Sequence, residues 1–355
     1  EKGFKQAYRT GAHFMEGGLS PHADPAEMVA ERLLKAIADD QDVSGGDWAC
    51  IDLSGRNLDG VDLSGAFLEQ VNFTGARLRG ANLKGAILAR AVLEDADLSG
   101  ANLEDANVGA VRARQAKFSG ANLKSAKLSK GDFTEANFTR AELEDVETLE
   151  VILNGAIFIE AHMPGMKFIE IKLQDIVFSG ADLTATVFYD CDITGVDFSE
   201  ALMTRCAWAD ARLEHVRFDG ADLTGACFAT SDPQKAALKD VSFAGAHLDR
   251  CCFRGMAMPG ADLSGASMVN ALFSSADLTG ADLSGTDARQ AQFRKARLAG
   301  ANLAGINLME GSLAKADIAN ASFVDANLYA VDMLRAVIEN TDFSGSNCDA
   351  TLMEE

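Results

Sequence analysis

Apolar residues return at every fifth position of this chain, from Leu53 to Met353, without a change of phase. The repeat begins IDLSG, RNLDG, VDLSG. An α-helix needs apolar residues about 3.6 positions apart and a half-buried strand needs them about 2 apart, so neither fits this period. The period instead fits a chain that turns a corner every five residues. A larger apolar residue is missing from the centre of the pentapeptide only at Ala113, Thr148, Pro233, Ala288 and Cys348.

Two positions of each pentapeptide are expected to point inward. One is the centre, usually Leu or Phe, and the other is the position two before it, usually Ala. The remaining positions carry mostly polar residues and glycine and should face solvent. Glycine in the last position suits a tight corner, and Asp or Asn before the centre can accept hydrogen bonds from nearby backbone amides. The sequence therefore predicts an all-β solenoid with a narrow core.

The repeated pattern A[DN]LxG resembles the pentapeptide-repeat family over residues 51–355. The resemblance implies a right-handed quadrilateral parallel β-helix with four pentapeptides in each coil. At that rate the repeats would form about fifteen coils, stacked at the spacing of neighbouring strands. Residues 51–355 are expected to form this β-helix, and residues 1–50 a linker and a capping helix.

Counting by twenties tests the expected stacking, because residues one coil apart should form a column. Each column contains similar side chains, as a continuous stacked core requires. Two of the columns below contain only phenylalanine, a third contains phenylalanine and one tryptophan, and a fourth contains only leucine. The columns are Phe118, Phe138, Phe158, Phe178, Phe198, Phe218; Phe168, Phe188, Trp208, Phe228; Phe253, Phe273, Phe293; and Leu63, Leu83, Leu103, Leu123, Leu143.

The segment DPAEMVAERLLKAIADD, before the repeats, is predicted to be a helix. Asp24 can cap it, Pro25 suits its first turn and Glu27 completes a capping box. We expect this helix to cover the first coil, because an open end of a solenoid exposes unpaired backbone. Phe4–Met15 is interpreted as a linker. The segment SDPQK around Pro233 is expected to be a distorted corner or a small bulge.

Composition limits the partners and the compartment. The formal net charge of −21 disfavours direct binding to nucleic acid or to an anionic membrane surface. No stretch has the length of a membrane span, and the first residues lack the apolar part of a signal peptide. The seven cysteines form no CxxC pair and are interpreted as small buried thiols of a cytoplasmic protein. The chain lacks an initiator methionine, which suggests a piece of a longer protein.

No catalytic or metal-binding pattern emerges. The five histidines are scattered and are interpreted as solvated surface residues. The carboxylates are numerous because the repeat places them at its turns, so no pair is singled out. We therefore expect a protein that is not an enzyme, with no catalytic residue, no metal and no cofactor.

A cluster of apolar residues occupies positions that should face solvent. An exposed apolar surface on a polar protein suggests a protein partner, and an irregular coil that turns these residues inward is the alternative. Counting by twenties places Leu149, Ile169 and Tyr189 in one column, which Met309 and Tyr329 would continue. The candidate partner-binding residues are Leu149, Ile157, Ile159, Ile169, Val177, Val187 and Tyr189, with Ile152 beside them.

Two functions follow as hypotheses. The first is a non-catalytic protein-interaction scaffold that forms the C-terminal domain of a larger bacterial protein. A short helix followed by a long A[DN]LxG solenoid looks like the pentapeptide-repeat proteins encoded with type VI secretion systems, which implies an adaptor for effector loading. The second is a mimic of DNA that binds gyrase or topoisomerase, as the acidic charge and the resemblance to quinolone-resistance pentapeptide proteins imply. The oligomeric state is left open.

Overall fold

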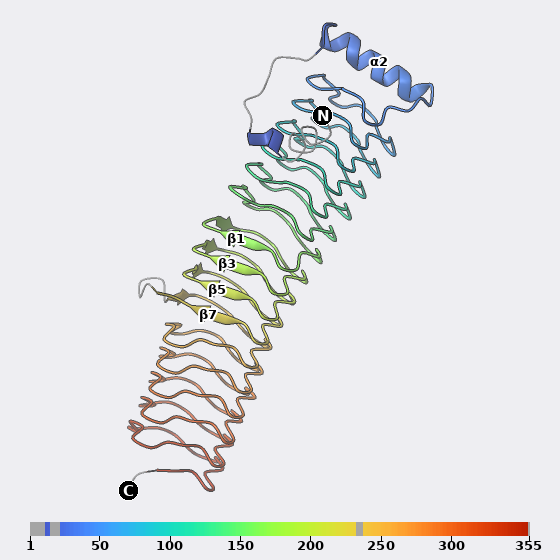
Figure 1. The fold of residues 1–355 in the computed structure, drawn as a ribbon. Coiled ribbons are helices and arrows are strands. Elements are labelled where there is room, and N and C mark those ends of the chain that lie inside the picture. The colour runs from blue at the N-terminus through green and yellow to red at the C-terminus, as the bar shows by residue number, and fades with distance from the viewer. Residues whose placement is uncertain (1–10, 15–21, 232–236, 354–355) are drawn as a thin grey trace. The chain divides into compact units, whose positions relative to one another are not determined.

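The computed structural model describes residues 11–14, 22–231 and 237–353. Within them the protein is a parallel β-solenoid with one N-terminal α-helix (Figure 1). Its residues group into two compact units, Glu1–Met166 with Asp175–Val177, and Lys167–Gln174 with Phe178–Glu355. We call them unit 1 and unit 2. The right-handed sense, the quadrilateral cross-section, the count of about fifteen coils and the division at residue 50 stay predictions.

In unit 1 the solenoid is held by parallel bridges between residues twenty positions apart. They run from Asp47↔Phe67 to Ile157↔Val177. Backbone hydrogen bonds alternate in direction: Leu53 N donates to Asn72 O at 2.8 Å, and Asn72 N donates to Ile51 O at 3.0 Å. The expected spacing of one turn is therefore confirmed in unit 1.

Unit 2 contains regular strands, which lie in four successive turns. They form two parallel four-stranded sheets, with the orders β1-β3-β5-β7 and β2-β4-β6-β8. Each strand buries its central residue and turns its flanking residues outward. The strands are β1 (Lys167–Ile169), β2 (Lys172–Gln174), β3 (Val187–Tyr189), β4 (Asp192–Thr194), β5 (Ala207–Ala209), β6 (Arg212–Glu214), β7 (Cys227–Ala229) and β8 (Leu238–Lys239).

One turn of unit 2 has twenty-five residues instead of twenty. The register steps by twenty from Ala207 to Cys227, then by twenty-five from Cys227 to Cys252. The twenty-residue step resumes with Cys252↔Leu272. The predicted distortion at SDPQK lies mostly outside the described residues, but the flanking register shows that this turn contains one additional pentapeptide.

The longer turn corrects two of the expected columns. Met309 and Tyr329 do not continue the column of Tyr189, which runs on through Ala209 and Ala229. Instead, backbone hydrogen bonds place Met309 above Arg289, Val269 and Asp249. The second error concerns Phe253, Phe273 and Phe293, which were expected to form a column of their own.

Phe253 stacks on Phe228, with ring centroids 4.7 Å apart. One ladder of stacked rings therefore runs through unit 2 as Phe168, Phe188, Trp208, Phe228, Phe253, Phe273 and Phe293. A second ladder comprises Phe178, Phe198, Phe218 and Phe243. Rings in successive turns stack because the strand spacing of about 4.8 Å brings them to stacking distance.

The corners use the chemistry that the repeat predicts. Asp52 Oδ1 accepts a hydrogen bond from the amide of Ser54 at 2.9 Å, and many later Asp and Asn residues do the same two residues ahead. The last residue of the pentapeptide has a positive φ, as at Gly265 with 65°. Many residues other than glycine also adopt it, including Ala185 with φ of 58°.

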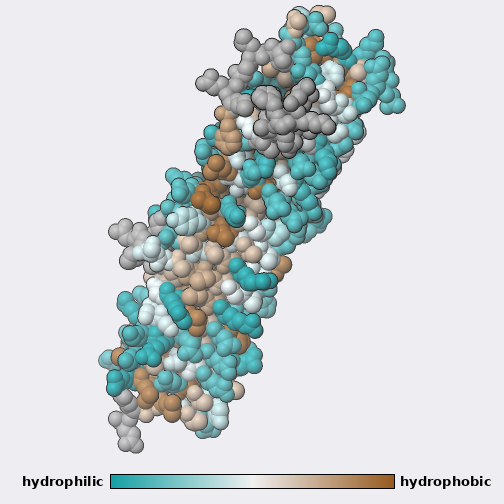
Figure 2. Space-filling view, viewed as in Figure 1, coloured by the Kyte–Doolittle hydropathy of each residue, from teal (hydrophilic) through white to brown (hydrophobic). Residues whose placement is uncertain are grey.

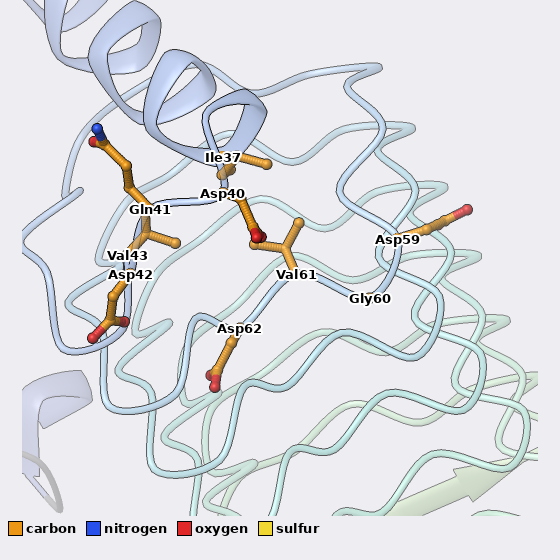
Figure 3. Close-up of a pocket in the computed structure, with 9 residues that line it drawn as sticks. All are labelled: Ile37, Asp40, Gln41, Asp42, Val43, Asp59, Gly60, Val61 and Asp62. Atoms are coloured by element: carbon orange, nitrogen blue, oxygen red, sulfur yellow. The ribbon is translucent and has the colours of Figure 1, made fainter.

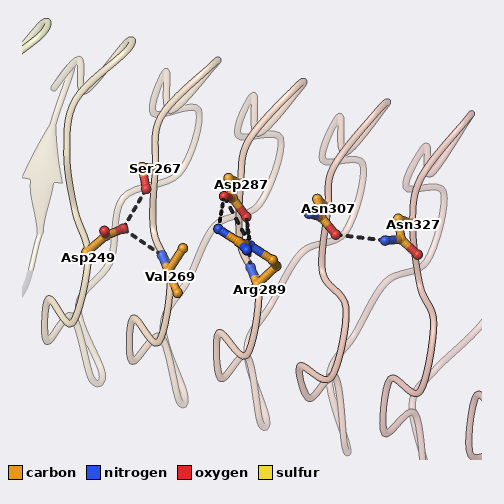
Figure 4. Close-up of polar contacts among 7 residues, drawn as sticks. All are labelled: Asp249, Ser267, Val269, Asp287, Arg289, Asn307 and Asn327. Carbon is orange, nitrogen blue, oxygen red and sulfur yellow. Dashed lines mark hydrogen bonds and ion pairs between the residues drawn. The ribbon is translucent and has the colours of Figure 1, made fainter.

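Polar side chains also link successive turns on the outside of unit 2 (Figure 4). Asp249 Oδ1 accepts hydrogen bonds from the Ser267 hydroxyl at 2.6 Å and from the Val269 amide at 2.9 Å. Asn327 Nδ2 donates to Asn307 Oδ1 at 2.9 Å, one turn away. These contacts satisfy polar groups along the surface and add to the backbone ladder.

The predicted helix is present as α2 (Ala26–Ala38) and lies at the N-terminal end of the solenoid of unit 1 (Figure 1). Val29 and Leu33 are fully buried and form the apolar face of this helix. The predicted cap is wrong: Pro25 occupies the N-cap position, without a side-chain hydrogen bond. Asp24 forms an ion pair with Arg32 of the helix at 3.2 Å instead, so its carboxylate does not cap the first backbone amides.

Candidate functional site

The outer face of the sheet β1-β3-β5-β7 in unit 2 is largely apolar. Its outward residues are Lys167, Ile169, Val187, Tyr189, Ala207, Ala209, Cys227 and Ala229. Lys167 is the one charged residue among these eight. We call this surface the apolar sheet face. In Figure 2, drawn from the same side as Figure 1, the region of these strands is mainly brown to pale.

Ile169 and Tyr189 are the large apolar residues of this face that are exposed. They are register partners on neighbouring strands, with 51% and 45% of their surface exposed. Their position follows from the repeat, because the residue after each buried centre must point outward. At that position most pentapeptides have a polar residue, so isoleucine and tyrosine expose apolar surface that the fold does not bury.

The sheet β2-β4-β6-β8 provides a polar contrast within the same turns. Its outward residues are Lys172, Gln174, Asp192, Thr194, Arg212, Glu214 and Lys239. Glu214 bonds Lys239 at 2.7 Å and Arg212 at 3.1 Å. Those neighbouring cations, with the Lys239 hydrogen bond as the largest cause, lower the pKa of Glu214. Within these turns, the apolar character is therefore a property of one sheet and not of the other.

The other predicted partner-binding residues lie in unit 1 or are less exposed. Leu149 and Ile159 of unit 1 are exposed, and Ile152 beside them is exposed as well. Ile157 and Val177 are half-buried partners in one parallel bridge of unit 1. Val187 is half-buried in the apolar sheet face. Thus none of the seven candidates turns into the core.

A short N-terminal segment docks on the solenoid of unit 1, which the sequence interpretation missed. The 3₁₀ turn η1 (Ala12–Phe14) places Ala12 in a cluster with Ile87, Ala89 and Phe67. Arg90 donates a hydrogen bond to the carbonyl of Ala12 at 2.7 Å. One signal was available: Phe67 is the one phenylalanine of the repeats that is not at a centre.

His13 of this segment is buried as well, which corrects the expectation of a solvated histidine. It is 4% exposed, and its Nδ1 lies 3.1 Å from Asn107 Oδ1. Its ring occupies the space in which a Cβ on Gly109 would lie, so a glycine is needed there. Burial is the largest cause of the lowered pKa of His13. The Asn107 hydrogen bond and Glu147 partly oppose this shift, and the charges of Lys130 and Arg90 add to it.

The cysteines divide into buried and half-exposed thiols, where all had been interpreted as buried. Cys191, Cys206 and Cys251 are buried, and the Cys251 thiol donates to the carbonyl of Leu223. Burial raises the pKa of Cys206 and of Cys251 to about 12 and that of Cys191 to about 11. Cys50, Cys227, Cys252 and Cys348 are half-exposed.

A pocket of about 460 Å³ opens between the C-terminal end of α2 and the first turn of the solenoid (Figure 3). Asp40, Asp42, Asp59 and Asp62 lie around it, together with Ile37 and Val61. In Figure 3 the carboxylate of Asp59 points away from those of Asp42 and Asp62. Within residues 11–14, 22–231 and 237–353, no three His, Cys, Asp or Glu side chains could together hold a metal ion. In the same residues no helix is long and apolar enough to cross a bilayer.

Family models identify the class of protein that this solenoid defines. The model for pentapeptide repeats matches eight segments between residues 42 and 347, which together cover more than half of the chain. A second model, for a pentapeptide repeat region, matches residues 151–228. The chain belongs to the pentapeptide-repeat family. A search of curated proteins found no match.

Several solved structures of pentapeptide-repeat proteins are similar to this chain. HetL, involved in heterocyst differentiation regulation in the cyanobacterium Nostoc, is 21% identical to this chain with a TM-score of 0.23. The match covers 89% of this chain and 95% of HetL. QnrB1, a plasmid-mediated fluoroquinolone resistance protein, is 16% identical with a TM-score of 0.29, and the match covers 66% of this chain and 94% of QnrB1. A thylakoid lumen protein of Arabidopsis thaliana is 32% identical with a TM-score of 0.21, and the match covers 34% of this chain and 69% of that protein. Similarity at these TM-scores says nothing about a partner of this chain.

Proposed function

We propose that this protein is a non-catalytic interaction scaffold that binds a protein partner through the apolar sheet face of unit 2. The observation that carries the proposal is the exposed pair Ile169 and Tyr189 on a sheet with one charged outward residue, next to a sheet with five. Exposed apolar surface of this kind is a common feature of interaction sites.

The geometry of the face suits a flat, preformed contact. Its strands are fixed by backbone hydrogen bonds on both sides, so binding would order few additional groups. Tyr189 offers an aromatic ring with a hydroxyl, a combination that is enriched among the residues that dominate interface energies. The small outward residues Ala207, Ala209 and Ala229 leave room for side chains of the partner.

The test compares substitutions at equivalent positions of the two sheets. Ile169→Asp with Tyr189→Asp changes the apolar sheet face, and Gln174→Asp with Thr194→Asp changes the register partners of the polar sheet. Each protein is immobilised and exposed to a lysate of the source cells. We expect the wild type and the polar-sheet variant to capture the same partner. The apolar-face variant should capture at least tenfold less of it.

The baits must be shown to fold equally well, by circular dichroism and thermal unfolding. Since all four positions point outward, we expect melting temperatures within about 2 °C of each other. Leu149→Asp in unit 1 is a separate bait, because Leu149 is exposed there at 55%. Equal capture of every specific partner by all baits would contradict a role for these apolar residues.

The narrower form of the proposal is an adaptor that loads effectors in type VI secretion. Its support is the layout of the chain, in which a short helix precedes a long A[DN]LxG solenoid. A secretion-spike or effector protein that depends on Ile169 and Tyr189 would establish it.

Mimicry of DNA toward gyrase or topoisomerase is the second hypothesis, supported by the net charge of −21. Basic side chains interrupt the acidic surface of unit 1, as in the pairs Arg79 with Asp97 and Arg140 with Glu160. A uniform anionic surface is therefore absent among the described residues of unit 1, which is why we rank this function second. Gyrase captured equally by all baits would reverse the ranking.

A further inference from the structure

The longer turn of unit 2 brings two half-exposed cysteines together. Cys227 and Cys252 are direct register partners in a parallel bridge, although twenty-five residues separate them in sequence. The amide of Phe228 donates to the carbonyl of Cys252 at 2.8 Å, and the amide of Cys252 donates to the carbonyl of Ala226 at 3.0 Å. These two bonds fix the backbone on both sides of the pair.

Packing beneath the cysteines holds their side chains on the same side. The residues that follow them, Phe228 and Phe253, are buried and stacked at 4.7 Å. Since neighbouring residues of a strand point to opposite faces, both thiols point outward. Their Cα atoms lie one strand spacing apart, about 4.8 Å, within the range of about 4.4–6.8 Å that a disulfide spans.

We propose that Cys227 and Cys252 are a redox-active dithiol that forms a reversible disulfide between consecutive turns when it meets a small-molecule disulfide as oxidant. The inference does not rest on the proposed function. It concerns a modification site on the outer side of unit 2, at the edge of the apolar sheet face, to which Cys227 of β7 belongs.

The reaction is a double thiol–disulfide exchange. One cysteine, as its thiolate, attacks the external disulfide, forms a mixed disulfide and releases one small thiolate. The other, after losing its proton, attacks the cysteine sulfur of that mixed disulfide and releases the second. The two protons lost by the cysteines end on the two small thiols, so the protein loses two electrons and the external disulfide gains them.

The surroundings of the pair act on this chemistry in two directions, because burial opposes formation of the thiolate and a nearby cation favours it. Burial, followed by the neighbouring Cys252 thiol, raises the pKa of Cys227 to about 11, while the charge of Arg254 opposes the shift. The cation of Arg254 is placed to stabilise a thiolate as the exchange begins. Directly paired residues of parallel strands have Cβ atoms about one strand spacing apart, more than the mean of about 3.8 Å in disulfides. The bond therefore forms under strain, and small thiols reduce it readily.

The other cysteines provide internal controls. Cys251 is adjacent in sequence to Cys252, but it is buried and its thiol donates to a backbone carbonyl at 2.9 Å. Cys50 and Cys348 are half-exposed, and neither has a cysteine as a bridge partner among the described residues. Reaction at Cys227 and Cys252 should therefore differ from reaction at every one of these three.

The test treats the reduced full chain with oxidised glutathione and maps each cysteine by mass spectrometry. We expect the wild type to lose two hydrogen atoms through a Cys227–Cys252 link, and dithiothreitol to reverse the change. Cys227→Ser and Cys252→Ser should each carry glutathione on the remaining cysteine. That adduct should be at least about tenfold more abundant than in the wild type, because the neighbouring thiol is no longer present to displace it. Cys50→Ser with Cys348→Ser should form the link as the wild type does.

The link also has a thermal consequence, because it closes the twenty-five-residue turn. Oxidised wild type should melt about 5 °C above reduced wild type, and neither single variant should change on oxidation. Stable glutathione adducts on both Cys227 and Cys252 of the wild type would overturn the proposal. So would two unreacted thiols at these positions while Cys50 or Cys348 reacts.

Discussion

Individual residues at the corners are conformationally strained wherever the repeat lacks its glycine. Ala185 ends the pentapeptide ADLTA with φ of 58°, whereas Gly265 ends ADLSG with φ of 65°. A left-handed residue with a Cβ costs about 1–2 kcal/mol, and a glycine costs about 0.5–1 kcal/mol in the entropy of the unfolded chain. The strain is the larger of the two, so glycine is preferred at this corner.

Ala185→Gly should therefore increase the free energy of unfolding by about 0.5–1 kcal/mol, and Gly265→Ala should lower it by about 1 kcal/mol. A Cβ at Gly265 meets no atom within 4 Å, so the second change measures backbone strain without a clash. Urea unfolding of both variants provides the measurement. Changes of the same sign would show that corner strain does not govern these positions.

His13 makes docking of η1 dependent on pH. Its pKa is lowered from the reference value of 6.5, mainly by burial. Above pH 6.5 the ring is neutral whether docked or released, so the docking is fully stable there. As the pH falls below 6.5, the released ring gains a proton that the docked ring resists, and docking weakens until the pH passes the lowered pKa.

A ring-proton NMR titration measures this effect directly. The midpoint of His13 should lie below 6.5, and removal of Asn107 by Asn107→Ala should lower it further, because that hydrogen bond raises the pKa. A His13 midpoint at or above 6.5 would be incompatible with the buried ring.

At the scale of elements, the aromatic ladders hold the turns of unit 2 in register. Phe198 is fully buried between Phe178 and Phe218, with both ring centroids at 5.2 Å, and meets Trp208 edge to face at 5.6 Å. Replacing it leaves a cavity that the hydrogen-bonded turns cannot close. The ladder should thus be sensitive to loss of a single ring.

Phe198→Ala should lower the free energy of unfolding by about 3–5 kcal/mol, and Phe198→Leu should lower it by less, because leucine refills part of the cavity. Denaturant unfolding followed by far-ultraviolet circular dichroism compares the two. Equal losses for both would mean that ring volume does not determine the stability of this turn.

The sequence was sufficient to predict which residues are buried, because burial depends on the place within the pentapeptide. It was insufficient to predict which residues meet in successive turns, because that depends on the length of the turn. Burial at Leu53 or Phe198 follows from the period alone, as does the amide bond to Asp52. The partner of a residue in the next turn depends on turn length, and an additional pentapeptide leaves the phase unchanged. For that reason Met309 and Tyr329 were assigned to the wrong column.

The candidate site shows the same division. That Ile169 and Tyr189 point outward was predictable, because they follow a buried centre. The docking of Ala12–Phe14 was not, since a three-residue turn outside the repeats has no period and is held by contacts with residues such as Arg90 and Asn107. The pairing of Cys227 with Cys252 was equally hidden in the register.

At the scale of the whole molecule, charge determines which polymers the protein avoids. The net charge of −21 predicts no binding to duplex DNA. An electrophoretic mobility assay at low salt should show no shifted band at micromolar protein. A shift that disappears with added salt would contradict this prediction and reveal a local basic site.

The twenty-five-residue turn shows how such a chain can change length. The place of a residue within its pentapeptide determines whether its side chain points into the core or toward solvent. Its place within the turn determines where around the solenoid it lies. A gain of four or six residues would turn acidic side chains into the core of every later turn. A gain of five leaves the interior intact and only rotates the surface, so that new neighbours can meet on the outside while the core is left unaltered.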